Sequence, residues 1–310
     1  MNDTAILDIL DDFFPASPLI RASTKKVRGI ACATQVLRSE ILAAFDDADK
    51  PVTVRQMYYL LTVRGAVEKT EAGYRQVQHQ LVLMRRAGLI PYIWIADNTR
   101  WVRRPTTFND VPSAVLETAR AYRRMVWKDL PVTVEVWCEK DALAGVIVDV
   151  TSVYDVPLLV ARGYSSESFA YEAAQTIKEN GKPGIVYYVG DFDPSGWNMS
   201  ANLEKKLRQF GADISFERLA IKPEQIEAWN LPSRPTKRTD TRCREFFDTF
   251  GADTPSVELD ALHPNTLRQI IREAIEIHLP AGHLADLEMV EAEERELWQE
   301  LLNVAHGATA

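Results

Sequence analysis

The fold is decided by Gly184-Ile-Val-Tyr-Tyr-Val-Gly-Asp-Phe-Asp-Pro-Ser-Gly196. Its apolar half, 185–189, predicts a buried strand, and two carboxylates, Asp191 and Asp193, follow that strand directly. Pro194 then favours the first turn of a helix. Ligands of open α/β sheets bind at the carboxyl edge of the strands, and side chains two residues apart leave a strand on the same side. The two carboxylates can therefore converge on one cation, or they can form a surface turn that caps the helix.

Composition is typical of a soluble globular protein, and 310 residues are enough for two domains. No run approaches the roughly 18 apolar residues that span a bilayer. The acidic N-terminus does not resemble a secretory signal. The three cysteines have no metal-binding spacing and fit reduced thiols. We therefore expect a cytoplasmic protein that does not enter a membrane.

Charge is unevenly distributed along the chain. The net charge is −8, yet residues 51–131 hold 13 Lys or Arg and 6 Asp or Glu, a balance of +7, which leaves −15 for the remainder. A basic segment joined to an acidic one is typical of a protein that binds nucleic acid through one part. Ordinary solvated helix faces are the alternative explanation.

The basic segment predicts two helices and a strand pair. Thr53 is a candidate N-cap for a helix over 54–64, and a second helix is expected over 70–87, before Gly88. An apolar strand at 92–96 and a basic return over 100–104 complete the pattern of a winged helix, which binds DNA through a helix and basic side chains. Helix–hairpin units also bind proteins. The candidate DNA contacts are Arg85, Arg86, Arg100, Arg103 and Arg104.

The helix over 54–64 carries a candidate nucleophile. Its apolar face contains Tyr58, which we expect in the core, whereas Tyr59 lies one turn from Arg55 on a face predicted to be open to solvent or a partner. A guanidinium beside a phenol favours the phenolate and steadies an attacked phosphate. An exposed tyrosine is more often structural, so the pair alone indicates little.

Residues 131–221 predict a parallel, doubly wound sheet. Strands are expected at 131–138, 156–161, 185–189 and 213–221, with helices between them, and an edge strand at 257–260. Glu139 follows the first strand as Asp191 and Asp193 follow the third. Because parallel strands end at one edge, three carboxylates can meet there, and such a set of hard oxygens suits Mg²⁺. Helix capping by these acids is the alternative. Neither a dinucleotide-binding glycine motif nor a Walker loop is present, so no nucleotide cofactor is predicted.

Four short motifs, in this order, resemble a known family. Glu139-Lys140-Asp141-Ala142, Arg162-Gly163-Tyr164 and Gly190-Asp-Phe-Asp-Pro-Ser-Gly196 are similar to the motifs of Toprim domains, which are Rossmann-like and mostly parallel. Arg55-Gln-Met-Tyr-Tyr59, upstream of them, resembles the tyrosine motif of the topoisomerase VI A subunit and the related meiotic double-strand-break transesterase. The resemblance covers roughly 51–280. It implies a winged helix (51–128) and a Toprim domain (129–280). On either side of it, the spacing of apolar residues predicts an N-terminal helical arm (1–50) and a C-terminal amphipathic helix (281–310).

The resemblance implies a type II DNA topoisomerase or a DNA double-strand-cleaving transesterase. Tyr59 would attack a phosphodiester of double-stranded DNA and remain on the 5′ end, Arg55 would assist at the phosphate, and Glu139, Asp191 and Asp193 would hold Mg²⁺. The family's active site combines the tyrosine of one protomer with the metal of the other, which implies a homodimer. This chain carries no ATPase region, so strand passage would need a separate ATPase subunit. A Toprim nuclease that uses water, and a non-catalytic DNA-binding or assembly subunit, are the alternatives.

Overall fold

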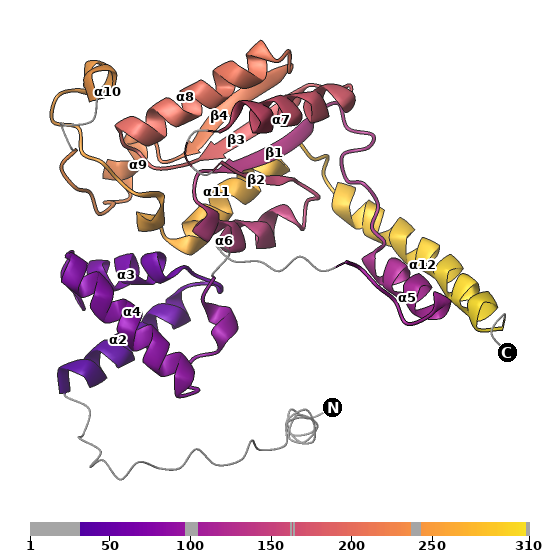
Figure 1. The fold of residues 1–310 in the computed structure, drawn as a ribbon, viewed down its shortest axis with the longest axis horizontal. Coiled ribbons are helices and arrows are strands. Elements are labelled where there is room, and N and C mark those ends of the chain that lie inside the picture. Colours follow the sequence, from indigo (N-terminus) through magenta and orange to yellow (C-terminus); the bar gives the residue numbers. More distant parts are fainter. Residues whose placement is uncertain (1–31, 97–104, 162, 164, 237–242, 308–310) are drawn as a thin grey trace, which may run out of the picture. The chain divides into compact units, whose positions relative to one another are not determined.

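The computed structural model describes residues 32–96, 105–161, 163, 165–236 and 243–307 (Figure 1). The chain divides into two compact units, 1–36 and 37–310. Helix α2 (Cys32–Asp47) begins in the first unit, and its later part buries Leu37, Ile41 and Phe45 in the core of the second.

A four-stranded sheet, parallel throughout, forms the centre of this unit. Its order is β2-β1-β3-β4, as expected for an α/β protein in which helices connect parallel strands. The predicted parallel sheet is thus confirmed. Cys138 of β1 is paired with Val189 of β3, so these two strands end side by side. The bounds are β1 (Thr133–Cys138), α6 (Asp141–Thr151), β2 (Leu158–Val160), α7 (Glu167–Glu179), β3 (Gly184–Val189), α8 (Pro194–Gln209) and β4 (Ile214–Ala220).

Both faces of the sheet are covered by helices. Trp137 and Tyr188 face α7 and α8, and their neighbours Val136 and Tyr187 belong to the core on the other face, with α6 and α11 (Pro264–Glu276) (Figure 1). Successive strand residues point to opposite faces, so a strand that is apolar at every position is buried on both. The continuous apolar run 185–189 reflects this double burial.

Helices α3 (Val54–Val63) and α4 (Glu71–Arg86) match the two predicted helices, with Thr53 and Thr70 as their N-caps. The strand predicted at 92–96 is wrong, because Tyr92–Trp94 form a 3₁₀ turn and Ile95 makes a single parallel bridge to Val52. Tyr92 and Ile93 are 62% and 81% exposed, so their apolar character does not mark a buried strand face. The return over 100–104 lies outside the described residues.

Thr53 has two hydrogen bonds that make it sensitive to substitution. Its hydroxyl accepts from the Gln56 amide at 2.9 Å, in a capping box, and donates to Asp260 Oδ1 at 3.1 Å. We expect Thr53→Ala to lower the free energy of unfolding by about 1–2 kcal/mol. Thr53→Ser keeps the hydroxyl and should lose less than half of that. Urea denaturation compares the two variants, and equal losses would contradict the role given to the hydroxyl.

The remaining elements connect or extend the sheet. The edge strand predicted at 257–260 is replaced by two isolated antiparallel bridges, Phe192 to Val257 and Arg234 to Ser256, and a 3₁₀ turn, Leu259–Ala261. The C-terminal helix α12 contacts α5. Among the described residues, no helix combines the length and apolarity that a membrane crossing requires. The other bounds are α5 (Val111–Ala121), α9 (Pro223–Ala228), α10 (Cys243–Phe250) and α12 (His283–Gly307).

Candidate functional site

The ends of β1 and β3 bring two of the predicted metal ligands into contact. The Asp191 amide donates to Glu139 Oε2 at 2.9 Å, and both side chains are largely buried. Burial and the charge of Asp191 raise the pKa of Glu139 to about 7, and burial also raises the pKa of Asp191. Asp193 has a capping role, because its Oδ1 accepts from the Gly196 amide at 2.8 Å at the start of α8. We call these three residues the acidic edge.

Two glycines make room for the Glu139 carboxylate. A Cβ atom at Gly190 would lie 2.7 Å from Glu139 Oε2 and 2.6 Å from Tyr188 Cε1. A Cβ atom at Gly196 would lie 3.0 Å from the same carboxylate oxygen and 2.5 Å from the Asp191 carbonyl oxygen. The backbone carbonyl cannot move as a side chain does, so position 196 is the more restrictive of the two.

We expect Gly196→Ala to lower the free energy of unfolding by about 1–3 kcal/mol, since it overfills a packed site. Gly190→Ala should also destabilise the fold, because its Cβ would meet the buried Tyr188 ring as well as the Glu139 carboxylate. Gly88→Ala is the matched control, since its Cβ would meet no atom within 4 Å and only its φ of +71° would be strained. Urea denaturation measures all three, and a Gly196→Ala variant as stable as the wild type would contradict this packing.

Lys140 binds one carboxylate of the acidic edge, that of Asp191, and two further acids. Its Nζ lies 2.8 Å from Asp191 Oδ1, 2.8 Å from Asp260 Oδ2 and 3.8 Å from Glu258 Oε2. Burial favours a lower pKa for Lys140, but the three carboxylates outweigh burial and raise it. The ammonium therefore stays charged among these acids.

Glu258 and Asp260 join the tyrosine helix α3 to this cluster. Glu258 Oε2 lies 2.5 Å from Arg55 Nη1, and Glu258 Oε1 lies 3.0 Å from Arg234 Nη1. Asp260 accepts from Thr53, at the start of the same helix. Lys140, Arg55 and Arg234 outweigh burial and lower the pKa of Glu258, so it is a carboxylate at neutral pH. No role could be predicted for Glu258 and Asp260 from the sequence, because their partners at the start of α3 lie more than 200 residues away along the chain.

A cleft of about 690 Å³ opens between α3, α4 and the acidic edge. Arg55, Arg85, Lys140 and Asp191 are among its lining residues. The Arg85 guanidinium lies over the Tyr92 ring at 5.3 Å, and its buried Nε has no hydrogen-bond partner among the described residues. The structure thus gathers one predicted DNA contact, one predicted metal ligand and Arg55 around one cleft. Arg86 is exposed and does not line it, and Arg100, Arg103 and Arg104 lie outside the described residues.

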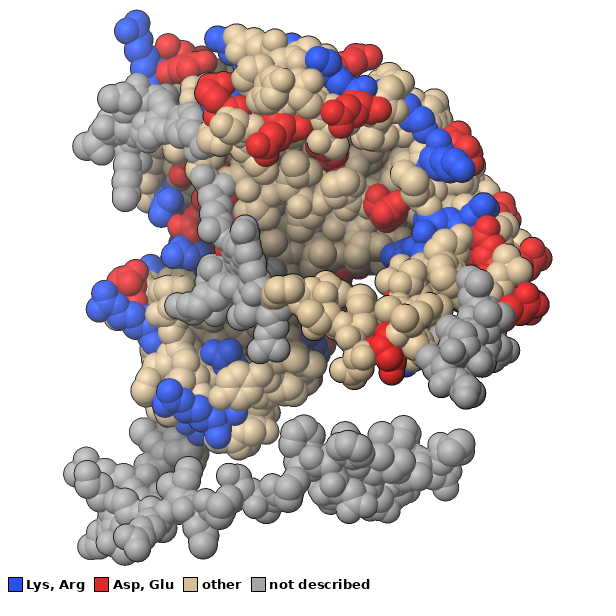
Figure 2. Space-filling view, turned by 45° about the vertical axis from the view of Figure 1, so that its right-hand side comes forward, with Lys and Arg blue, Asp and Glu red and all other residues tan. Residues whose placement is uncertain are grey.

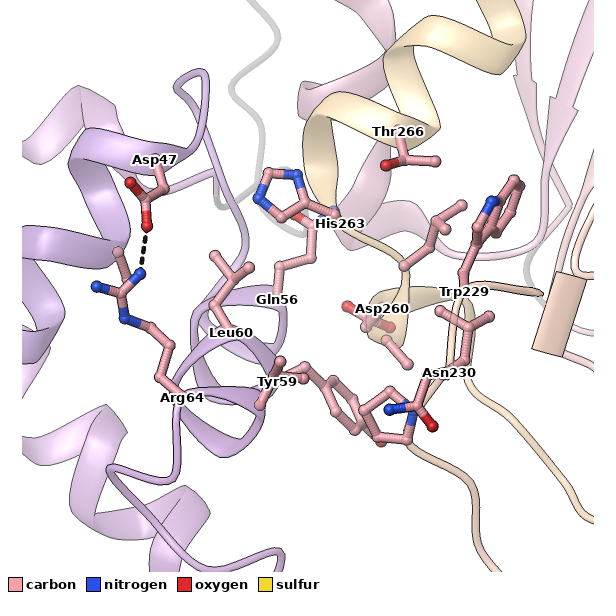
Figure 3. Close-up of a pocket in the computed structure, with 16 residues that line it drawn as sticks. Asp47, Gln56, Tyr59, Leu60, Arg64, Trp229, Asn230, Asp260, His263 and Thr266 are labelled. Carbon is pink, nitrogen blue, oxygen red and sulfur yellow. Dashed lines mark hydrogen bonds and ion pairs between the residues drawn. The ribbon is translucent and has the colours of Figure 1, made fainter. Parts of the chain in front are cut away.

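Tyr59 is buried, at 5% exposure, which corrects the expectation that its face is open. It lines one cavity of about 360 Å³ beside Trp229 and Asn230, and Figure 3 shows it extending from α3 toward the loop that carries Asn230. It also lines a second cavity, together with Arg55 and Glu258. Burial and the charge of Glu258 raise the pKa of Tyr59, and Arg55 opposes them without reversing the sign. The phenol is therefore protonated at neutral pH in this state.

Surface charge over the sheet and its helices does not single out a site (Figure 2). In the upper part of Figure 2, where Figure 1 shows the sheet and its helices, Lys and Arg side chains are interspersed with Asp and Glu. Bulk charge therefore does not direct an anion to that face. Local groups of cations, such as those lining the cleft, decide where a phosphate can bind.

The donor chemistry of the acidic edge fits Mg²⁺, although the side chains are not gathered around an ion. Among the described residues, no three Asp, Glu, His or Cys side chains form a group that could hold a metal. Glu139 and Asp191 nevertheless bring carboxylate oxygens to one edge of the sheet, two glycines leave space for the Glu139 carboxylate, and Asp191 already binds one cation, the Lys140 ammonium. Glu139, Asp191 and Asp193 are therefore the side chains that would hold such an ion.

A scan of the chain against protein-family models finds no match, and a search of curated proteins also finds none.

Proposed function

We propose that this chain is a DNA-cleaving transesterase of the topoisomerase VI A-subunit kind, with a winged helix at 51–128 and a Toprim domain at 129–280. One observation carries the proposal: Arg55, from the helix that bears Tyr59, lines the same cleft as Asp191 of the acidic edge. A guanidinium and a carboxylate edge around one cleft are the groups that a phosphodiester and its metal ion require.

The chemistry is an exchange of ester bonds. The Tyr59 oxygen attacks phosphorus, so that a phosphotyrosyl bond forms at the 5′ end of one fragment, and the bond between phosphorus and the 3′ oxygen of the other fragment breaks. The phenol loses its proton and the departing 3′ oxygen gains one, so no water is consumed and the step is reversible. Because the pKa of Tyr59 is raised, bound DNA must place Arg55 or another cation against the phenol before attack.

The other residues bind and orient the substrate. Arg55 holds the attacked phosphate, and Arg85, Arg86, Arg100, Arg103 and Arg104 contact the DNA backbone on either side. Glu139, Asp191 and Asp193 would hold Mg²⁺, which when bound neutralises charge on the phosphate oxygens. Lys140 must then give up its contact with Asp191 or share that carboxylate with the ion.

We further propose a homodimer in which Tyr59 of one protomer faces the acidic edge of the other. This pairing rests on the family resemblance; within one chain, Tyr59 and Asp191 line neighbouring cavities that share Arg55 and Glu258. Strand passage would need a separate ATPase subunit.

The burial of Tyr59 favours one competing function, a nuclease in which the acidic edge activates water and the tyrosine is structural. Incubation with plasmid DNA and Mg²⁺, followed by denaturation, separates the functions. Protein-linked breaks support the transesterase, and breaks with free ends support the nuclease. DNA binding without breaks, in Mg²⁺ or Mn²⁺, leaves a non-catalytic DNA-binding or assembly subunit.

A further inference from the structure

Tyr59 shares its second cavity with three cationic side chains. This cavity, of about 360 Å³, is lined by Tyr59, Arg55, Lys69, Arg234 and Glu258, together with parts of the α3–α4 loop and of loop 233–235. We call it the tyrosine pocket. Its volume is in the range of small-ligand sites.

Lys69 is fixed at one side of this pocket. Its Nζ donates to the Ser233 carbonyl oxygen at 2.6 Å and lies 5.5 Å from the centre of the Tyr59 ring. The pKa of Lys69 is lowered, chiefly by burial, and Arg234 adds to the lowering while Glu258 opposes it. An anion between Lys69 and Arg234 would relieve their repulsion.

Arg234 is fixed at the other side. Glu258 binds one nitrogen of Arg234 and one nitrogen of Arg55, so a single carboxylate positions both guanidiniums. Each guanidinium has five N–H donors, and its contact with Glu258 uses only part of them. The Arg234 side chain is 44% exposed, so a ligand can reach it.

We infer that Lys69 and Arg234 bind, together with Arg55, the DNA phosphate that Tyr59 attacks. The inference rests on the proposed function and extends it, because it supplies two phosphate contacts from the chain that carries the tyrosine. Glu258 is then a positioning residue that orients the two arginines. The pocket is lined by one other acid, Glu71, which forms an ion pair with Arg75 (Oε1 to Nε, 3.3 Å).

DNA binding in the presence of EDTA tests the inference without any cleavage. Fluorescence anisotropy of a labelled duplex is measured over a range of salt concentrations for Lys69→Gln, Arg234→Gln and the wild type. A plot of log affinity against log salt concentration has a negative slope. Each substitution should make this slope less steep by about 0.9, the value for one lost phosphate contact. Lys69→Arg and Arg234→Lys should keep the slope. Arg208→Gln, an exposed arginine of α8 paired with Glu204, is the control and should leave the slope unchanged.

Unchanged slopes in Lys69→Gln and Arg234→Gln would overturn the inference, whether or not the tyrosine forms adducts. Lowered slopes without any protein–DNA adduct would support phosphate binding in the pocket and contradict the transesterase. Thermal unfolding of each variant identifies a misfolded one, and the charge-retaining substitutions then supply the comparison. A loss of slope in Arg234→Lys equal to that in Arg234→Gln would also contradict the inference, since charge is retained.

Discussion

Tyr59→Phe is expected to reduce covalent protein–DNA adducts on the order of 10³-fold or more, because it removes the one oxygen that forms the new bond to phosphorus. The phenyl ring remains in place, so its packing beneath Lys69 is kept. We therefore expect little change in the free energy of unfolding. The measurement is radiolabelled DNA retained on protein after denaturation, with Mg²⁺ in the reaction.

Tyr58→Phe is the matched control. Tyr58 is as buried as its neighbour, and its hydroxyl donates to the Thr70 carbonyl oxygen at 3.3 Å. Its loss should cost about 1 kcal/mol of stability and leave adduct formation intact. Adducts that persist in Tyr59→Phe and disappear in Tyr58→Phe would assign the nucleophile to the other tyrosine. Free-ended breaks that survive both substitutions would favour the nuclease.

Asp191→Asn is expected to lower Mg²⁺-dependent cleavage about 10²-fold or more while DNA binding in EDTA is retained. The reason is that Asp191 supplies a charged oxygen at the acidic edge, next to Glu139, which accepts from the Asp191 amide. Asp260→Asn is the control: it removes another carboxylate from Lys140 but is not a proposed metal ligand. It should cost stability, through Thr53 and Lys140, and keep the Mg²⁺ response. A Mg²⁺ response lost equally in both variants would contradict the assignment.

Mixing the two inactive variants tests the shared active site. In a heterodimer of Tyr59→Phe and Asp191→Asn, one tyrosine faces one intact acidic edge if the site is built from two chains. Single-strand breaks should then reappear in the mixture. A mixture as inactive as its components, with heterodimers present, would place tyrosine and acids in the same chain.

The sheet could be predicted from sequence because β1 and β3 are largely apolar runs, followed directly by Glu139 and by Gly190 and Asp191. Double burial makes every position of 185–189 apolar, and Pro194 marks the next helix. Residues 92–96 are also mostly apolar, but the strand predicted there is wrong, because five residues cannot distinguish a strand from a 3₁₀ turn. At 257–260, likewise, only single bridges form.

Part of the site could not be predicted from the local sequence pattern. A helical wheel placed Tyr59 beside Arg55 but could not show that loop residues 229–235 enclose it. Glu258 and Asp260 gain their contacts with α3 only when segments more than 200 residues apart meet. The sequence also did not predict that Lys69 and Arg234 lie in one pocket, because they are brought together by the contact between Lys69 and Ser233.

The most direct test is mass spectrometry of the reacted protein. After incubation with DNA and Mg²⁺, denaturation and exhaustive nuclease digestion, the peptide that contains Tyr58 and Tyr59 is sequenced by fragmentation. The account predicts a nucleotide attached through phosphate to Tyr59. DNA cleaved in the same reaction, with this peptide unmodified throughout, would contradict it.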